Sequence, residues 1–333
     1  MKSTDKITAS HVATVAQPRI KHGVKALALT SLLGVAAFSS SVQATVQNAQ
    51  LSQPHAPCVD DKWPKSRLIS LASNQFELPD ADRETMVLRL VSCLAETDPE
   101  LRDSVAFSGL SHWLRASALE KETVNGLYTR LSKDVRQQKN DPDGVYFPFA
   151  ILTLSEVARV DRVSPFLDSA ERDDFSKLAA DTMASTRDYR GFDDTLGWRH
   201  QVAHSADLLL QLILNPALSQ ASIMQLVESL QTQLSPVGHF YVYGEPERLA
   251  RPVLYAMLRD DIPEEFWHSQ LTKWGTPAHI DSWDKAFTSN TGLAERHNRR
   301  AFFSALLLGV SGSKQARLLA LQPAIQAAMK KLP

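Results

Sequence analysis

The chain has 333 residues, 44% of them hydrophobic and 22% charged, with a formal net charge of −1 at pH 7. A chain of this length and composition can bury a full hydrophobic core. Its charge balance argues against a nucleic-acid partner, because such partners select for strongly basic surfaces.

Residues 1–44 have the pattern of an export signal. A basic stretch precedes an apolar core at residues 26–38, and a run of small residues ends at Ala44. The apolar core is shorter than the roughly 20 residues that a membrane-spanning helix needs. We therefore predict a signal peptide that is cleaved after Ala44 and a protein that is periplasmic or secreted.

Removal of residues 1–44 changes the charge balance. They contain 5 of the 36 Lys and Arg residues and 1 of the 37 Asp and Glu residues, so residues 45–333 carry 31 basic and 36 acidic side chains. An acidic chain is poorly suited to bind nucleic acid or an anionic membrane surface. No later segment has the length and apolarity of a membrane span, so we expect no membrane-spanning helix after the leader.

Residues 45–62 are polar and contain prolines, a composition typical of a flexible arm. Cys58 in this arm and Cys93 in the following helical region are the only two cysteines. In an oxidising compartment they could form a disulfide that ties the arm to the first helices. The alternative is a buried free thiol at Cys93 and an unpaired Cys58. Sequence spacing does not supply the geometry that a bridge requires, so both alternatives stay open.

Residues 63–333 read as one all-helical domain. Apolar residues recur three and four positions apart, and short turns with Pro, Gly or Asp separate about ten segments. Shorter helices are predicted near residues 68–72, 87–94 and 101–114. Further helices are predicted at 122–135, 145–160, 165–187, 200–215, 219–234, 245–258, 264–274, 293–310 and 314–331. Only residues 236–243 resemble a strand, and they lack a partner. This pattern predicts an all-α fold, an irregular α-solenoid of HEAT-like antiparallel helical pairs.

The stretch from Asp188 to Asn215 is the most informative part of the chain. It opens with a polar turn that contains glycines and continues into a helix that is apolar on most faces. At about 100° per residue, His200, His204 and Asp207 fall on one stripe of that helix. A helix so apolar is normally buried, so its polar side chains need partners. We predict a buried polar cluster around these three residues.

The run Gly197-Trp198-x-His200-x-x-Ala203-His204-x-Ala206-Asp207-Leu208 resembles a bacterial family catalogued as domain of unknown function 2785. Matching motifs elsewhere are Asp98-Pro99-x-x-Arg102-Asp103, Asp188-x-Arg190-Gly191, Glu245-x-Glu247-Arg248-Leu249-Ala250 and Asn298-Arg299-x-Ala301-Phe302. The resemblance covers nearly all of residues 45–333 and implies an all-helical, HEAT-like fold without an assigned activity. Two positions depart from the family pattern: Pro246 replaces an acidic residue, and the segment Phe147-Pro148-Phe149 lacks an expected Arg-Ser pair.

A metal site is one possible use of the stripe. His200 and His204 lie one helical turn apart, and Asp207 could supply an oxygen ligand, with Glu245 or Glu247 completing the shell. The spacing lacks the glutamate of the H-E-x-x-H motif. These three stripe residues are weak metal candidates, and we assign the chain no metal or other cofactor.

A second use is acid–base chemistry on a polymer or a small substrate in a helical groove. Two groups with different pKa values would be needed as proton donor and acceptor. The candidates are Asp188, His200, Glu245 and Glu247, with Trp198 and Tyr243 able to stack on sugar rings. This hydrolase or lyase, with or without a metal ion, is the alternative function.

A third use is structural. Buried charges are tolerated when they are paired, and side chains of both signs could clamp neighbouring helix pairs. The candidate cluster comprises Asp188, Arg190, Trp198, His200, His204, Asp207, Glu245, Glu247 and Arg248. We therefore expect an exported helical binding or scaffold protein, whose ligand (a small molecule, a glycan or a protein) the sequence does not assign.

Overall fold

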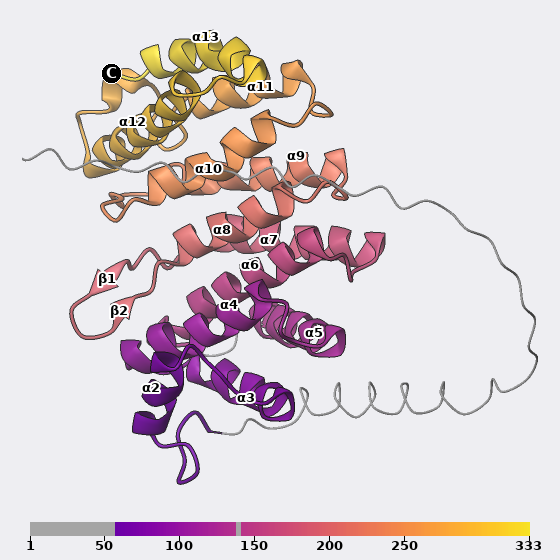
Figure 1. Cartoon of the computed structure of the whole chain (residues 1–333). Coiled ribbons are helices and arrows are strands. Elements are labelled where there is room, and N and C mark those ends of the chain that lie inside the picture. Colours follow the sequence, from indigo (N-terminus) through magenta and orange to yellow (C-terminus); the bar gives the residue numbers. More distant parts are fainter. Residues whose placement is uncertain (1–56, 138–140) are drawn as a thin grey trace, which may run out of the picture. The chain divides into compact units, whose positions relative to one another are not determined.

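The computed structural model describes residues 57–137 and 141–333 (Figure 1). The predicted signal peptide, residues 1–44, and most of the predicted arm lie outside the described residues. The described chain is mostly helical, with twelve α-helices and one two-stranded hairpin. The all-α fold class is thereby confirmed. None of the described helices is long and apolar enough to cross a membrane.

The helices follow one another with short connections. In chain order they are α2 (Lys65–Ser73), α3 (Asp80–Cys93), the π-helix η1 (Glu100–Phe107), α4 (Ser108–Arg115), α5 (Lys121–Gln137), α6 (Tyr146–Val163), α7 (Ser169–Ser185), α8 (Gln201–Ile213), α9 (Gln220–Ser229), α10 (Glu245–Met257), α11 (Glu264–Trp274), α12 (Asn290–Ser311) and α13 (Ala316–Lys330). The hairpin pairs β1 (Phe192–Asp193) with β2 (Gly197–Trp198). Single 3-10 turns occur at Leu230–Gln233 and Trp283–Lys285.

Local sequence explains where several of these helices begin. Asp168 and Glu171 form a capping box at α7, in which each carboxylate accepts a hydrogen bond of 2.8 Å from the other residue's backbone N–H. Ser219 and Ser289 cap α9 and α12 through their hydroxyl oxygens. Such caps satisfy the N–H groups that a first turn leaves unpaired. Pro246, which departs from the family pattern, lies in the first turn of α10, where a proline is tolerated.

Helix α8 is packed between α6 and α10, and α10 packs in turn against α12 (Figure 1). Buried apolar side chains from these helices join one connected core cluster, for example Leu154, Leu209, Val253 and Phe302. Because α8 has neighbours on two sides, most of its surface is shielded from water. Of the predicted stripe, His200 and His204 are buried, whereas Asp207 is only partly buried.

Cys58 and Cys93 are joined by a disulfide, with an S–S distance of 2.09 Å and a Cα–Cα distance of 4.7 Å. Arg89 on α3 adds to this link, because its guanidinium donates to the carbonyls of Pro57 and Cys58 and to the carboxylate of Asp60. The part of the predicted flexible arm that the structure describes is thus fixed to α3.

Residues 236–243, which resemble a strand but were expected to lack a partner, form an irregular loop. Side chains of α12 take the place of a partner strand. The Asn298 amide oxygen accepts from the Tyr241 N–H at 2.9 Å, and its Nδ2 donates to the His239 carbonyl at 2.8 Å. His297 Nε2 lies 3.1 Å from the Tyr241 carbonyl oxygen. The hairpin in residues 192–198 was not expected, because two strands of two residues each leave almost no periodic signal.

Candidate functional site

His200 does not lie within the helix as expected. It is the residue before α8 and has a left-handed backbone with φ 58°. Its N–H donates to the Arg190 carbonyl at 3.1 Å, and its carbonyl accepts from the His204 N–H at 3.0 Å. His200 therefore connects the hairpin segment to the first turn of α8. A left-handed conformation costs a non-glycine residue about 1–2 kcal/mol, so the surrounding contacts must hold it in place.

The His200 ring is buried beside a buried carboxylic acid. It stacks on Trp198 with 4.8 Å between ring centroids and lies 6.1 Å from the His204 ring. Its Nε2 is 3.6 Å from Glu245 Oε1, and the two residues are 8% and 2% exposed. Burial, together with the charge of Arg248, lowers the pKa of His200 to about 4. Burial also raises the pKa of Glu245.

His204 is held as a neutral ring. Its Nδ1 lies 3.0 Å from the Pro148 carbonyl oxygen on α6, so Nδ1 carries the hydrogen and donates it. The ring meets Phe149 edge to face at 5.3 Å. Burial, followed by the nearby His200 and Arg248, lowers the pKa of His204 to about 3.

Asp207 is paired with Arg248, which joins α8 to α10. Arg248 Nε donates to Asp207 Oδ1 at 3.1 Å, and Nη2 donates to Oδ2. Burial raises the pKa of Asp207, and Arg248 acts in the opposite direction. Glu247, also on α10, is exposed and lies outside this cluster.

The three weak metal candidates, His200, His204 and Asp207, face other groups of the protein. His204 Nδ1 is engaged by a carbonyl, and both Asp207 oxygens face Arg248. In residues 57–137 and 141–333, no group of three or more His, Cys, Asp or Glu side chains is placed to hold a metal ion.

Asp188 and Arg190, which precede the hairpin in the chain, form a separate ion pair. Arg190 Nε and Nη2 donate to the two Asp188 carboxylate oxygens at 2.9 and 2.6 Å. Although burial would raise it, the hydrogen bonds from Arg190 lower the pKa of Asp188. The backbone hydrogen bond from His200 to the Arg190 carbonyl connects this pair to the histidines.

Arg102 on η1 is a positioning residue that the sequence did not assign to the cluster. It is fully buried, and its Nη2 donates to the Leu196 and Trp198 carbonyls at 2.7 and 3.2 Å. Its guanidinium also lies 4.7 Å from the centroid of the Phe149 ring. Arg102 therefore fixes the hairpin against α6. The motif Asp98-Pro99-x-x-Arg102-Asp103 was the available signal, and without coordinates nothing linked it to residues 196–198.

A groove with a volume of about 690 Å³ lies between the hairpin segment and the loop before α10. We call it the hairpin groove, and it is lined by Arg187, Asp188, Tyr189, Arg190, Gly191, Phe192, Arg199, His239, Val242 and Tyr243. Phe192 and Tyr243 are 45% and 39% exposed. Gly191 is required here, because a Cβ at that position would lie 2.0 Å from the Tyr243 ring. Of the predicted site residues, Asp188 and Arg190 line this groove, together with Tyr243, which was predicted to stack on a sugar ring.

The lining of the hairpin groove is predominantly positive. It contains the three guanidinium groups of Arg187, Arg190 and Arg199 and one carboxylate, that of Asp188. Arg199 is buried, with Nη1 donating to the Asp143 carbonyl at 3.3 Å and Nη2 lying 3.5 Å from the Asp193 carboxylate. Its Nε has no hydrogen-bond partner in the described part of the chain.

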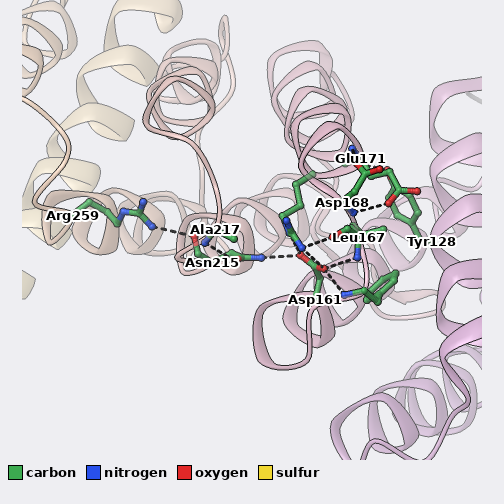
Figure 2. Close-up of polar contacts among 10 residues, drawn as sticks. Tyr128, Asp161, Leu167, Asp168, Glu171, Asn215, Ala217 and Arg259 are labelled. Carbon is green, nitrogen blue, oxygen red and sulfur yellow. Dashed lines mark hydrogen bonds and ion pairs between the residues drawn. The ribbon is translucent and has the colours of Figure 1, made fainter.

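A second polar centre, which the sequence did not suggest, lies at the other end of α8. Figure 2 shows Asp161 of α6 among the groups that bind it. Its carboxylate accepts from the Leu167 N–H at 2.9 Å, from Arg172 Nε at 2.7 Å and from Asn215 Nδ2 at 2.9 Å. Asn215 in turn accepts at its carbonyl from Arg259. Every oxygen of Asp161 is engaged, so this centre is structural.

One known family matches the part of the chain that contains most of these features. The family described as "Protein of unknown function (DUF2785)" matches residues 131–308. This range contains the hairpin groove and the buried cluster around His200, whereas Arg102 and the disulfide lie before it. No curated protein and no solved structure matches the chain.

Proposed function

The chain belongs to the DUF2785 family, and we propose that it is an exported helical binding protein whose ligand lies in the hairpin groove. One contrast carries this proposal. The groove is open and lined by aromatic and cationic side chains, whereas His200, His204 and Glu245 are buried outside its lining. Clefts that combine apolar walls with a few polar groups are the usual places for ligands.

In this proposal the buried cluster around His200, His204 and Asp207 holds the walls of the groove in place. His204 binds α6 through Pro148, and Asp207 binds α10 through Arg248. Glu245 accepts a hydrogen bond of 3.0 Å from the N–H of Tyr243, a residue that lines the groove. The cluster thus fixes both walls, since His200 also holds the hairpin side through Arg190. Rigid support of this kind lowers the entropic cost of ligand binding.

We further propose that the helices form HEAT-like antiparallel pairs. Short connections between consecutive helices favour antiparallel neighbours, and α5 packs on α6, α7 on α8, and α12 on α13. Stacked helical pairs commonly bind ligands on an extended surface.

Export is supported by two independent features. Residues 1–44 carry the basic, apolar and small-residue regions of a signal peptide. The Cys58–Cys93 disulfide is typical of a protein in an oxidising compartment such as the periplasm.

The alternative, a hydrolase or lyase, has one observation in its favour. Glu245 and His200 form a close pair in which burial raises the pKa of the acid and lowers that of the base. Such separated pKa values are found in acid–base sites. The burial of both groups makes the binding role the better supported one.

The binding role is tested with a ligand panel on the purified mature chain. Tryptophan fluorescence and thermal shift are recorded for amino acids, short peptides, and neutral and acidic oligosaccharides. Tyr243→Ala removes a groove wall, and Tyr255→Ala, on the exposed side of α10, is the matched control. We expect at least one compound to bind the control like the wild type and to bind Tyr243→Ala at least tenfold more weakly. A panel without any such compound would contradict the proposal, and turnover that Glu245→Gln abolishes would favour the enzyme.

A further inference from the structure

We infer that the hairpin groove takes an oligosaccharide whose sugars carry carboxylates, that is, a uronic-acid oligomer. This inference rests on the proposed binding function and adds the chemical class of the ligand. Three properties of the groove support it: partly exposed aromatic rings, an excess of guanidinium groups, and an open form.

The aromatic rings are suited to a sugar. Tyr189 and His239 stack with 5.1 Å between their centroids, and both line the groove. The Phe192 and Tyr243 rings both contact Trp198, at 5.1 and 5.8 Å between centroids, and the Tyr243 hydroxyl donates to the Phe192 carbonyl at 3.4 Å. A sugar ring can lay its C–H face on such rings while its hydroxyl groups stay in water. A wholly apolar ligand would instead favour an enclosed pocket that buries most of its surface.

The charge of the groove favours an anionic ligand. Arg190 is paired with Asp188, and Arg199 lies 3.5 Å from the Asp193 carboxylate. Arg187 donates to the backbone carbonyls of Ala184 and Thr186 and adds a further positive charge. The sign is also opposite to that of the chain, since residues 45–333 hold 31 basic and 36 acidic side chains. A local field of reversed sign attracts a ligand of the complementary charge.

A carboxylate matches this charge better than a phosphate does. Planar guanidinium groups bind either anion through paired N–H donors. Two arginines and the nearby Asp193 leave a net charge of about one, which a single carboxylate balances and a phosphate dianion exceeds. The open form of the groove allows further sugars of an oligomer to extend beyond it.

The test measures binding by calorimetry to the mature chain. The probes are trimers of galacturonate, mannuronate and glucuronate, the methyl ester of the galacturonate trimer, and glucose 6-phosphate. We expect at least one acidic trimer to bind, and raised ionic strength to weaken this binding severalfold. If galacturonate is the trimer that binds, its ester should bind at least tenfold more weakly.

Two groove variants and one control locate the site. Arg190→Ala and Arg187→Ala should each weaken binding of the acidic trimer at least fivefold. Arg136→Ala is the matched control, because Arg136 and Arg190 side chains are 42% and 44% exposed and each pairs with one Asp. If Arg190→Ala lowers the melting temperature, Arg187→Ala carries the test.

Three outcomes overturn the ligand class. These are no binding of any acidic trimer, equal binding of the ester and its acid, or tighter binding of glucose 6-phosphate. In each case the groove itself stands if another panel compound still distinguishes Tyr243→Ala from Tyr255→Ala. If no compound does so, the binding function fails as well.

Discussion

The two histidines of the buried cluster are neutral at physiological pH, and their surroundings explain why. The His204 Nδ1–H is fixed by a carbonyl acceptor, and the His200 Nε2 faces a buried carboxylic acid at 3.6 Å. Protonation of either ring would place a charge beside Arg248, whose guanidinium acts on both. The surroundings of each histidine therefore keep its imidazole ring neutral and oppose its protonation.

This neutrality predicts a loss of stability in acid. The pKa of His200 falls from 6.5 to about 4 on folding, so between these values the unfolded chain binds more protons and the folded state is disfavoured as pH falls. His200→Asn removes the titrating ring and suits the left-handed backbone. We expect its free energy of unfolding to decline less than that of the wild type between pH 7 and pH 4, by up to about 3 kcal/mol. Urea unfolding at several pH values measures this, with exposed His268→Gln as control; identical slopes would refute the effect.

Helix α8 acts as the central element because each of its ends is tied to other helices. Its first turns are tied by His204 to α6 and by Asp207 to α10. Its last residues are tied through Asn215 to Asp161 of α6. These links are polar, whereas the surrounding contacts between helices are apolar. Polar links specify the register in which the helices pack, because each donor must meet its acceptor.

The link from α8 to α10 gives a stability prediction. Asp207→Ala leaves Arg248 half-buried without its partner, and we expect a loss of about 3 kcal/mol in the free energy of unfolding. Arg248→Ala should cost a similar amount. The double variant should then be less destabilised than the sum of the two, because the interaction is lost only once. Strict additivity in urea unfolding would mean that the pair is not coupled.

The link at the other end of α8 gives an independent prediction. Asp161→Ala leaves Arg172, Asn215 and two backbone N–H groups without their acceptor. We expect a loss of about 3–5 kcal/mol in the free energy of unfolding. Asp181→Ala, which breaks an exposed pair on α7, should cost less than about 1 kcal/mol. Equal melting temperatures for these two variants would show that the Asp161 centre adds nothing to stability.

Helix positions followed from the sequence because apolar periodicity is a local signal. The predicted helix at residues 200–215 corresponds to α8, and that at 245–258 to α10. His200 was misplaced because its departure from helical backbone depends on the Arg190 carbonyl, a contact of the folded hairpin. The hairpin groove could not be predicted, because packing against α12 brings residues 239–243 beside the hairpin segment.

In the described chain, some contacts that hold the hairpin come from residues that lie outside the range matched by the family. The match, residues 131–308, holds the groove and the cluster. Support for the hairpin comes from outside this range, through the buried Arg102 of η1. The segment around η1 in turn packs against α2 and α3. We therefore expect the stability of the first helices to be coupled to the shape of the groove.

The disulfide is the covalent part of that coupling. It closes a loop over a sequence separation of 35 residues, which by chain entropy stabilises the folded state by about 2–4 kcal/mol. We expect the double variant Cys58→Ser and Cys93→Ser to lose this amount in urea unfolding, and a reductant to lower the melting temperature of the wild type but not of the variant. Because α3 packs on η1, the variant should also bind any groove ligand more weakly. Binding that is unchanged in a variant with lowered stability would separate the groove from the first helices and refute the coupling.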